Sequence, residues 1–99
     1  MIVLAIDTAA NLCAACVYDT SGHAVLASQS DDIGRGHAEE LPGMIETVCQ
    51  TANVKLADFN RFCATTGPGN FTGVRVGLAM IRGLSLALDI PALGITSLA

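Results

Sequence analysis

The segment Thr72–Leu88 constrains the fold of this 99-residue chain more than any other part of it. The segment has the pattern of a helix with apolar residues on every side, and its few polar groups are Arg75, Arg82 and Ser85. A helix that is apolar all round must be covered all round. One sheet and one further helix do not supply that cover in so small a domain. We therefore expect a partner protein to dock on the helices.

The remaining pattern predicts an α/β domain with the element order βββαβαβ. Strand patterns and short turns at the start of the chain indicate antiparallel hairpins, and the later strands alternate with helices. This order predicts a five-stranded mixed sheet, 3-2-1-4-5, which is the ribonuclease H-like or actin-like (ASKHA) layout. The expected strands are 1–7, 12–19, 23–30, 61–66 and 92–95, and the expected helices are 37–52 and 72–88.

Three local features refine this prediction. The first strand is apolar up to Asp7, so we expect it to be buried on both faces. Pro42 lacks a backbone donor, which predicts that the first helix either begins close upstream or bends there. Residues 96–99 are typical of a helix start. We therefore interpret residues 1–99 as the first domain of a longer protein whose second domain is absent from this chain.

Composition and charge exclude several classes of protein. Hydrophobic residues make up 52% and charged residues 14% of the chain, unlike a disordered protein. The net charge is −4 and the basic residues are scattered, which argues against direct binding of nucleic acid. No apolar run reaches the roughly 18 residues of a membrane span, and no basic secretion leader opens the chain. These features predict a cytoplasmic protein that does not enter membranes.

The four cysteines do not have the spacing of a zinc site. Cys13 and Cys16 form a CxxC pair, but Cys49 and Cys63 do not form a second one. Residues three apart on a strand point to opposite faces, which disfavours joint binding of a metal. We expect buried, apolar cysteines, with a metal site or a disulfide as the alternatives.

The glycine-rich turn at residues 67–73 and the end of the first strand are the candidate anion site. Glycines allow backbone N–H groups to approach an anion, and a helix N-terminus follows the turn. The turn lacks the lysine of a P-loop, so a purely structural turn is the alternative. Asp7 either contributes to a phosphate site or caps the adjoining turn. A ribonuclease H-like nuclease would need a second carboxylate at the end of the fourth strand, where Thr65, Thr66 and Gly67 stand.

The start of the first helix does not carry a metal-binding pair. His37 would need a second histidine three or four residues later, and those positions hold Glu40 and Leu41. We therefore expect no metal site on this chain. The acidic residues Glu39 and Glu40 instead interact favourably with the positive end of the helix dipole.

The chain resembles the TsaB (YeaZ) family along all 99 residues. The resemblance rests on three stretches: Ile6-Asp7-Thr8, the sequence His37-Ala-Glu-Glu-Leu-Pro42, and the sequence Gly67-Pro-Gly-Asn-Phe-Thr-Gly-Val-Arg-Val-Gly77. It implies a two-domain, actin-like protein that acts as a non-catalytic subunit in placing threonylcarbamoyl on adenosine 37 of tRNA. The catalytic relative carries a metal-binding His-x-x-x-His that Leu41 interrupts here, so catalytic and metal-binding residues are not expected.

The resemblance also implies partners. These are a TsaD-type catalytic subunit, a TsaE-type ATPase, a second copy of the chain in isolation, and tRNA only through the complex. No cofactor is expected on this chain, although ATP or ADP belongs to the complex. The alternative is a nucleotide-binding or glycoprotease-like metalloenzyme domain of the same superfamily. The expected docking surface is Leu41, Met44, Ile45, Val48, Leu78 and Arg82, and the expected vestigial phosphate site is Asp7, Thr8, Gly67, Gly69, Thr72 and Gly73.

Overall fold

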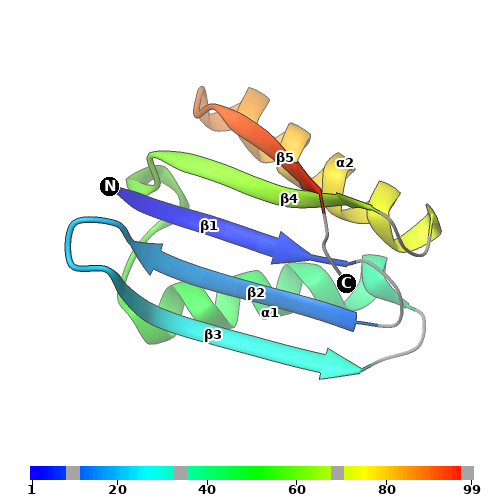
Figure 1. Cartoon of the computed structure of the whole chain (residues 1–99), viewed down its shortest axis with the longest axis horizontal. Coiled ribbons are helices and arrows are strands. Elements are labelled where there is room, and N and C mark those ends of the chain that lie inside the picture. The colour runs from blue at the N-terminus through cyan, green and yellow to red at the C-terminus, as the bar shows by residue number, and fades with distance from the viewer. Residues whose placement is uncertain (9–11, 33–35, 68–70, 97–99) are drawn as a thin grey trace.

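A five-stranded sheet with helices packed on it forms the body of the chain, as seen in a computed structural model (Figure 1). The structure describes residues 1–8, 12–32, 36–67 and 71–96. The elements along the chain are β1 (Ile2–Asp7), β2 (Leu12–Asp19), β3 (Ala24–Asp32), α1 (His37–Ala52), a short 3-10 helix (Leu56–Asp58), β4 (Arg61–Gly67), α2 (Phe71–Leu88) and β5 (Ala92–Thr96).

The sheet has the predicted strand order, β3-β2-β1-β4-β5. Strand β2 runs antiparallel to β1 and β3, whereas β4 runs parallel to β1 and β5. The short connections among β1, β2 and β3 permit hairpins, and α1 and α2 provide the longer crossovers that parallel strands need. The mixed α/β, actin-like fold class predicted from the sequence is therefore confirmed.

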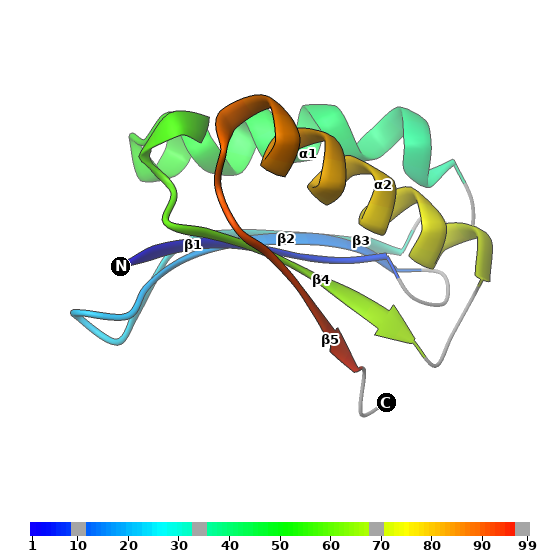
Figure 2. The same ribbon diagram turned by 90° about the horizontal axis from the view of Figure 1, so that it is seen from above.

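Both helices lie on the same face of the sheet (Figure 2). The core forms between this face and the helices, where Leu4 and Ile6 of β1 meet Phe62 of β4 and the inner face of α1. The expectation that β1 is buried on both faces is wrong. Val3, Ala5 and Asp7 alternate with the buried residues and remain partly exposed, because no described helix covers the second face.

The ends of both helices follow from local chemistry. Helix α1 begins at His37, just after Gly36 in the left-handed conformation (φ 92°), and so starts close upstream of Pro42 as expected. It ends at Asn53, which is also left-handed (φ 57°), and the N–H of Val54 donates to the carbonyl of Cys49 at 3.0 Å. Helix α2 ends in the same way at Asp89 (φ 55°). Such left-handed caps satisfy the last carbonyls of a helix and turn the chain away from its axis.

Helix α2 approaches β1 closely at one residue. A Cβ atom built on Gly77 would lie 2.5 Å from the Oγ1 atom of Thr8, whose side chain is almost completely buried. Real Cβ atoms essentially never come so close to another heavy atom. Glycine at this position therefore determines how near the helix lies to the end of the strand.

Two further sequence predictions concern membranes and the end of the chain. Among the described residues, neither helix combines the length and the apolarity that a membrane crossing requires. The predicted helix start at 96–99 falls mainly on residues 97–99, which lie outside the described residues, while Thr96 is the last residue of β5.

The close approach at Gly77 gives a direct stability prediction. Gly77→Ala forces the Thr8 side chain or the helix to move, and overpacking of this kind costs about 1–3 kcal/mol. Gly83→Ala on the same helix is the matched control, because its Cβ meets nothing within 4 Å. The control should raise the free energy of unfolding by up to about 1 kcal/mol, because alanine has a higher helix propensity than glycine. Urea unfolding measures both, and equal stabilities for the two variants would contradict the packing argument.

Candidate functional site

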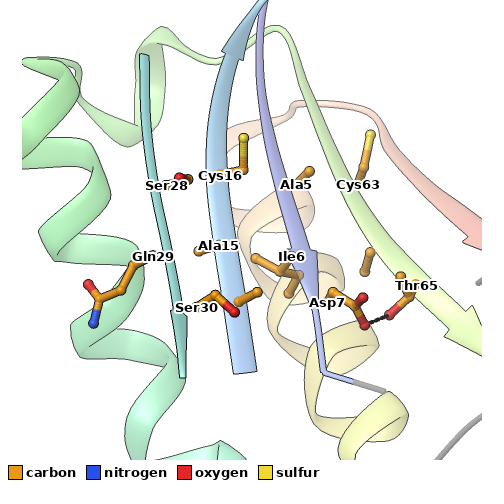
Figure 3. A pocket seen from close by; sticks show the side chains of 12 residues that line it. Ala5, Ile6, Asp7, Ala15, Cys16, Ser28, Gln29, Ser30, Cys63 and Thr65 are labelled. Carbon is orange, nitrogen blue, oxygen red and sulfur yellow. Dashed lines mark hydrogen bonds between the residues drawn. The ribbon is translucent and has the colours of Figure 1, made fainter. Parts of the chain in front are cut away.

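The carboxyl ends of β1 and β4 bring together the residues predicted for an anion site. The Oγ1 atom of Thr65 donates a hydrogen bond of 2.9 Å to the Oδ1 atom of Asp7 (Figure 3). Thr8 follows directly and is buried, and β4 ends at Gly67. Open α/β sheets bind ligands at this edge, so the topology places these residues where a ligand would lie.

The remaining residues of the predicted phosphate site are only partly placed. Thr72 and Gly73 fall in the first turn of α2, which begins at Phe71 beside this edge. Gly69 lies outside the described residues. What the structure shows is a carboxylate that accepts a threonine hydroxyl and so joins β1 to β4. A role in phosphate binding remains a prediction.

The described residues contain no group of three or more histidine, cysteine or acidic side chains that could hold a metal ion. A pocket lies over the middle strands beside these strand ends, and among the described residues that line it Asp7 carries the one carboxylate. Asp7 accepts a hydrogen bond from the uncharged hydroxyl group of Thr65. This bond is a structural link between β1 and β4.

The sheet face opposite the helices is hollowed by small side chains. A shallow pocket of about 260 Å³ lies over the middle strands. Ala5 pairs with Cys16 on β2 and with Cys63 on β4, so the three residues form one row across the sheet (Figure 3). Cys13, three residues before Cys16, is completely buried under the helices. The prediction that the CxxC cysteines point to opposite faces is therefore confirmed.

All four cysteines are free thiols, and three of them are buried while Cys16 is partly exposed. Burial raises the pKa of each thiol above its ordinary value, and the carboxylates of Glu40 and Asp31 add to this effect at Cys13. Reactive cysteines have lowered pKa values, because the thiolate is the nucleophile. The three buried thiols therefore act as packing groups, as the sequence predicted, whereas Cys16 does not show the expected burial.

The docking surface predicted on α1 requires a correction. Leu41, Met44, Ile45 and Val48 are only 0–5% exposed, because this face of α1 packs against β2 and β3. These side chains form the core and do not present a surface to a partner. Substitutions at these four positions would report on folding and not on docking.

The two predicted docking residues on α2 lie at the surface. Leu78 is 37% exposed and Arg82 is exposed, and both line a groove between α2 and β5. The structure therefore separates them from the four residues of α1 with which the sequence analysis grouped them.

A second groove, of about 490 Å³, runs between α1 and α2 on the outer side of the helix layer. Its floor is apolar, with Val76, Met80 and Leu84 at every fourth position of α2. Ala79 and Gly83 follow the same spacing and leave room for another backbone to come close. We call this the α1–α2 groove, and its lining is Ala38, Val76, Ala79, Met80, Gly83 and Leu84.

The α1–α2 groove was not predicted from the sequence, for a physical reason. Four of the six expected docking residues follow the apolar stripe of α1, which is the face that a helix buries against its own sheet. The signal that marks the groove is the pair of four-residue repeats on α2, an apolar one from Val76 and a small-residue one from Ala79. Neither repeat shows by itself which side of α2 faces the sheet.

Comparisons with known proteins match this chain to TsaB proteins and to the TsaD family profile. The family profile described as TsaD, tRNA N6-adenosine threonylcarbamoyltransferase, matches residues 25–99. The tRNA threonylcarbamoyladenosine biosynthesis protein TsaB of Buchnera aphidicola (subspecies Schizaphis graminum) is 37% identical over 97 residues, which cover 98% of this chain and 45% of the relative. TsaB of Escherichia coli K12 is 31% identical over 98 residues, which cover 99% of this chain and 41% of the relative.

The solved structure of YeaZ from Pseudomonas aeruginosa superimposes with a TM-score of 0.91 at 33% identity, covering 99% of this chain and 45% of that one. The sheet order and this superposition define an α/β domain of the actin-like, ribonuclease H-like class. Within that class, the chain belongs to the TsaB (YeaZ) family. It spans less than half the length of the curated relatives that it matches.

The bond between Thr65 and Asp7 should contribute measurably to stability. Thr65→Val removes the donor and leaves a partly buried carboxylate without this partner, which should cost about 1–3 kcal/mol. Thr65→Ser keeps the hydroxyl group and should retain most of that energy. Chemical unfolding of the two variants tests the assignment, and a stability of Thr65→Val equal to that of the unmodified chain would show that the hydrogen bond contributes nothing.

The raised thiol pKa values predict a loss of stability in alkali. A thiol whose pKa is higher in the folded chain than in the unfolded one stabilises the fold at low pH. This contribution is lost as the pH rises above the unfolded value of about 8.5. The free energy of unfolding should therefore fall as the pH rises above about 8.5, and Cys63→Ala should reduce the slope. A slope that is unchanged in this variant would contradict the assignment.

Proposed function

We propose that this chain is a non-catalytic scaffolding and activating subunit in the formation of threonylcarbamoyladenosine at adenosine 37 of tRNA. In this role it docks a TsaD-type catalytic subunit and holds that subunit in an active arrangement. The names of the TsaB relatives support the reaction, and the match to the TsaD family profile supports a partner of related fold.

The α1–α2 groove is the observation that carries the proposal. Its described lining consists of apolar or small residues, open to solvent on the outer side of the helix layer. Exposed apolar surface of this kind marks protein–protein contact sites. A helix laid over Ala79 and Gly83 reaches the floor formed by Val76, Met80 and Leu84 without a clash, so a partner with exposed helices of its own fits this groove.

A second observation supports the absence of catalytic chemistry. Leu41 occupies the position of the second histidine in the metal-binding motif of the catalytic relatives, and its side chain is completely buried in the core. The position serves the packing of α1 on the sheet. Catalysis in the assembly then depends on the partner subunit, and this chain contributes a surface.

The proposal includes the wider assembly. A TsaE-type ATPase joins the two subunits and brings ATP or ADP, and tRNA binds through the complex because this chain is acidic overall. In isolation the same groove pairs two copies of the chain. All of these interactions take place in the cytoplasm.

Blocking the groove should abolish docking. Gly83 has open space around it, so Gly83→Trp fills the groove and leaves the core intact. In sedimentation velocity with the TsaD-type protein of the same organism, this variant should bind at least about tenfold more weakly. The modified nucleoside, measured by mass spectrometry after reaction with tRNA, should decrease in parallel.

The matched control is Thr51→Trp, which places the same side chain at an exposed position in the last turn of α1. It should bind as the unmodified chain does. Wild-type binding by Gly83→Trp would refute the groove as the docking site. Binding of ATP by the isolated chain, lost in Asp7→Ala, would favour the nucleotide-binding alternative.

A further inference from the structure

The groove that Leu78 and Arg82 line, between α2 and the edge strand β5, lies on the opposite flank of α2 from the α1–α2 groove. It has a volume of about 820 Å³. Three exposed leucines line it: Leu78, Leu86 and Leu93, which are 37%, 80% and 55% exposed. Soluble domains seldom leave several large apolar side chains together at one surface unless another molecule covers them. We call this the α2–β5 groove.

The charge of this groove is opposite to that of the chain. Its charged lining residues are Arg75 and Arg82, and no carboxylate is among the described residues that line it. The chain as a whole carries a net charge of −4. Arg75 and Arg82 are seven residues apart, so they share one face of α2 and lie about 10 Å apart along the axis. The groove thus combines an apolar floor with two cations in register.

The geometry favours a helical occupant. Leu78, Arg82 and Leu86 follow each other at every fourth residue and form a ridge on α2. Ridges of this spacing pack against the ridges of another helix. A partner helix that places leucine-like side chains against Leu78 and Leu86 brings its own charged residues beside Arg82.

Helix α1 of a second copy would match the arginines of this groove in charge but would not cover its leucines. Helix α1 exposes Glu39 and Glu46, which also stand seven residues apart. Among the side chains whose burial the structure describes, the large apolar residues exposed outside the groove are Met1, Val25 and Leu26, and none of them lies on a helix. The outer face of α1 therefore has no leucine-like side chain with which to cover the floor.

Nucleic acid fits the floor even less well. Phosphates would satisfy the two arginines but would leave the three leucines in water. Complementary charge determines which partner binds and how fast, and apolar contact supplies most of the affinity. Both requirements point to a protein.

We propose that the α2–β5 groove binds an acidic amphipathic helix of another protein, with leucine-like residues on one face and carboxylates seven residues apart. The groove lies on the other flank of α2 from the α1–α2 groove. The inference therefore does not rest on the proposed role in tRNA modification.

The test uses a synthetic peptide as the probe. A fluorescein-labelled helical peptide of about 21 residues carries a leucine stripe and two glutamates seven residues apart, and a second peptide carries lysines in their place. Fluorescence anisotropy with the full 99-residue chain should show binding of the acidic peptide only. Arg82→Glu should weaken that binding at least tenfold and should admit the lysine peptide.

Control variants and contrary outcomes complete the design. Lys55→Glu makes the same charge change at an exposed residue outside the groove and should bind as the wild type does. Leu86→Ala should weaken binding, and circular dichroism should show an unchanged fold for every variant. Equal binding of both peptides, or of neither, would overturn the proposal. So would single-stranded RNA or a second copy of the chain that occupies the groove in a manner sensitive to Arg82→Glu.

Discussion

The contact between Gly77 of α2 and the buried Thr8 is the constraint on which the rest of the structure depends. It brings the helix axis close to the end of β1 and places the first turn of α2 beside the strand ends that hold Asp7 and Thr65. The same approach decides which side of an almost wholly apolar helix is inside. Once this side packs on the sheet, the other flanks of α2 must remain outside, where they form the two grooves.

Those two grooves have different chemistry although they share residues of one helix. Ala79 and Gly83 line both of them, so the outer surface of α2 between the grooves carries small residues. Towards α1 the walls are apolar and neutral, which suits close packing of a related helix layer. Towards β5 leucines alternate with arginines along α2, so this groove selects a partner by its charge as well as by its shape. The two grooves therefore meet along Ala79 and Gly83 of one helix.

Most of the fold was predictable from the sequence, and the reason is the change of period along the chain. Strand alternation gives way to helical spacing at His37, and left-handed caps at Asn53 and Asp89 end the helices where the pattern ends. The docking surface was not predictable in the same way. The stripe of Leu41 and Met44 is apolar because it is core, and hydrophobicity alone does not distinguish a buried face from a binding face. The Asp7–Thr65 bond was also beyond sequence reasoning, since it joins residues 58 apart.

The row formed by Cys16, Ala5 and Cys63 has a practical consequence for work on this chain. These two thiols belong to the uncovered face of the sheet, whereas Cys13 and Cys49 lie within the core beneath the helices. A polypeptide that covers this face shields the partly exposed thiol of Cys16 and leaves the buried Cys13 and Cys49 as they were. Alkylation followed by peptide mass mapping therefore distinguishes occupancy of the sheet face from a general tightening of the fold. The native sequence already contains both the reporter and its internal reference.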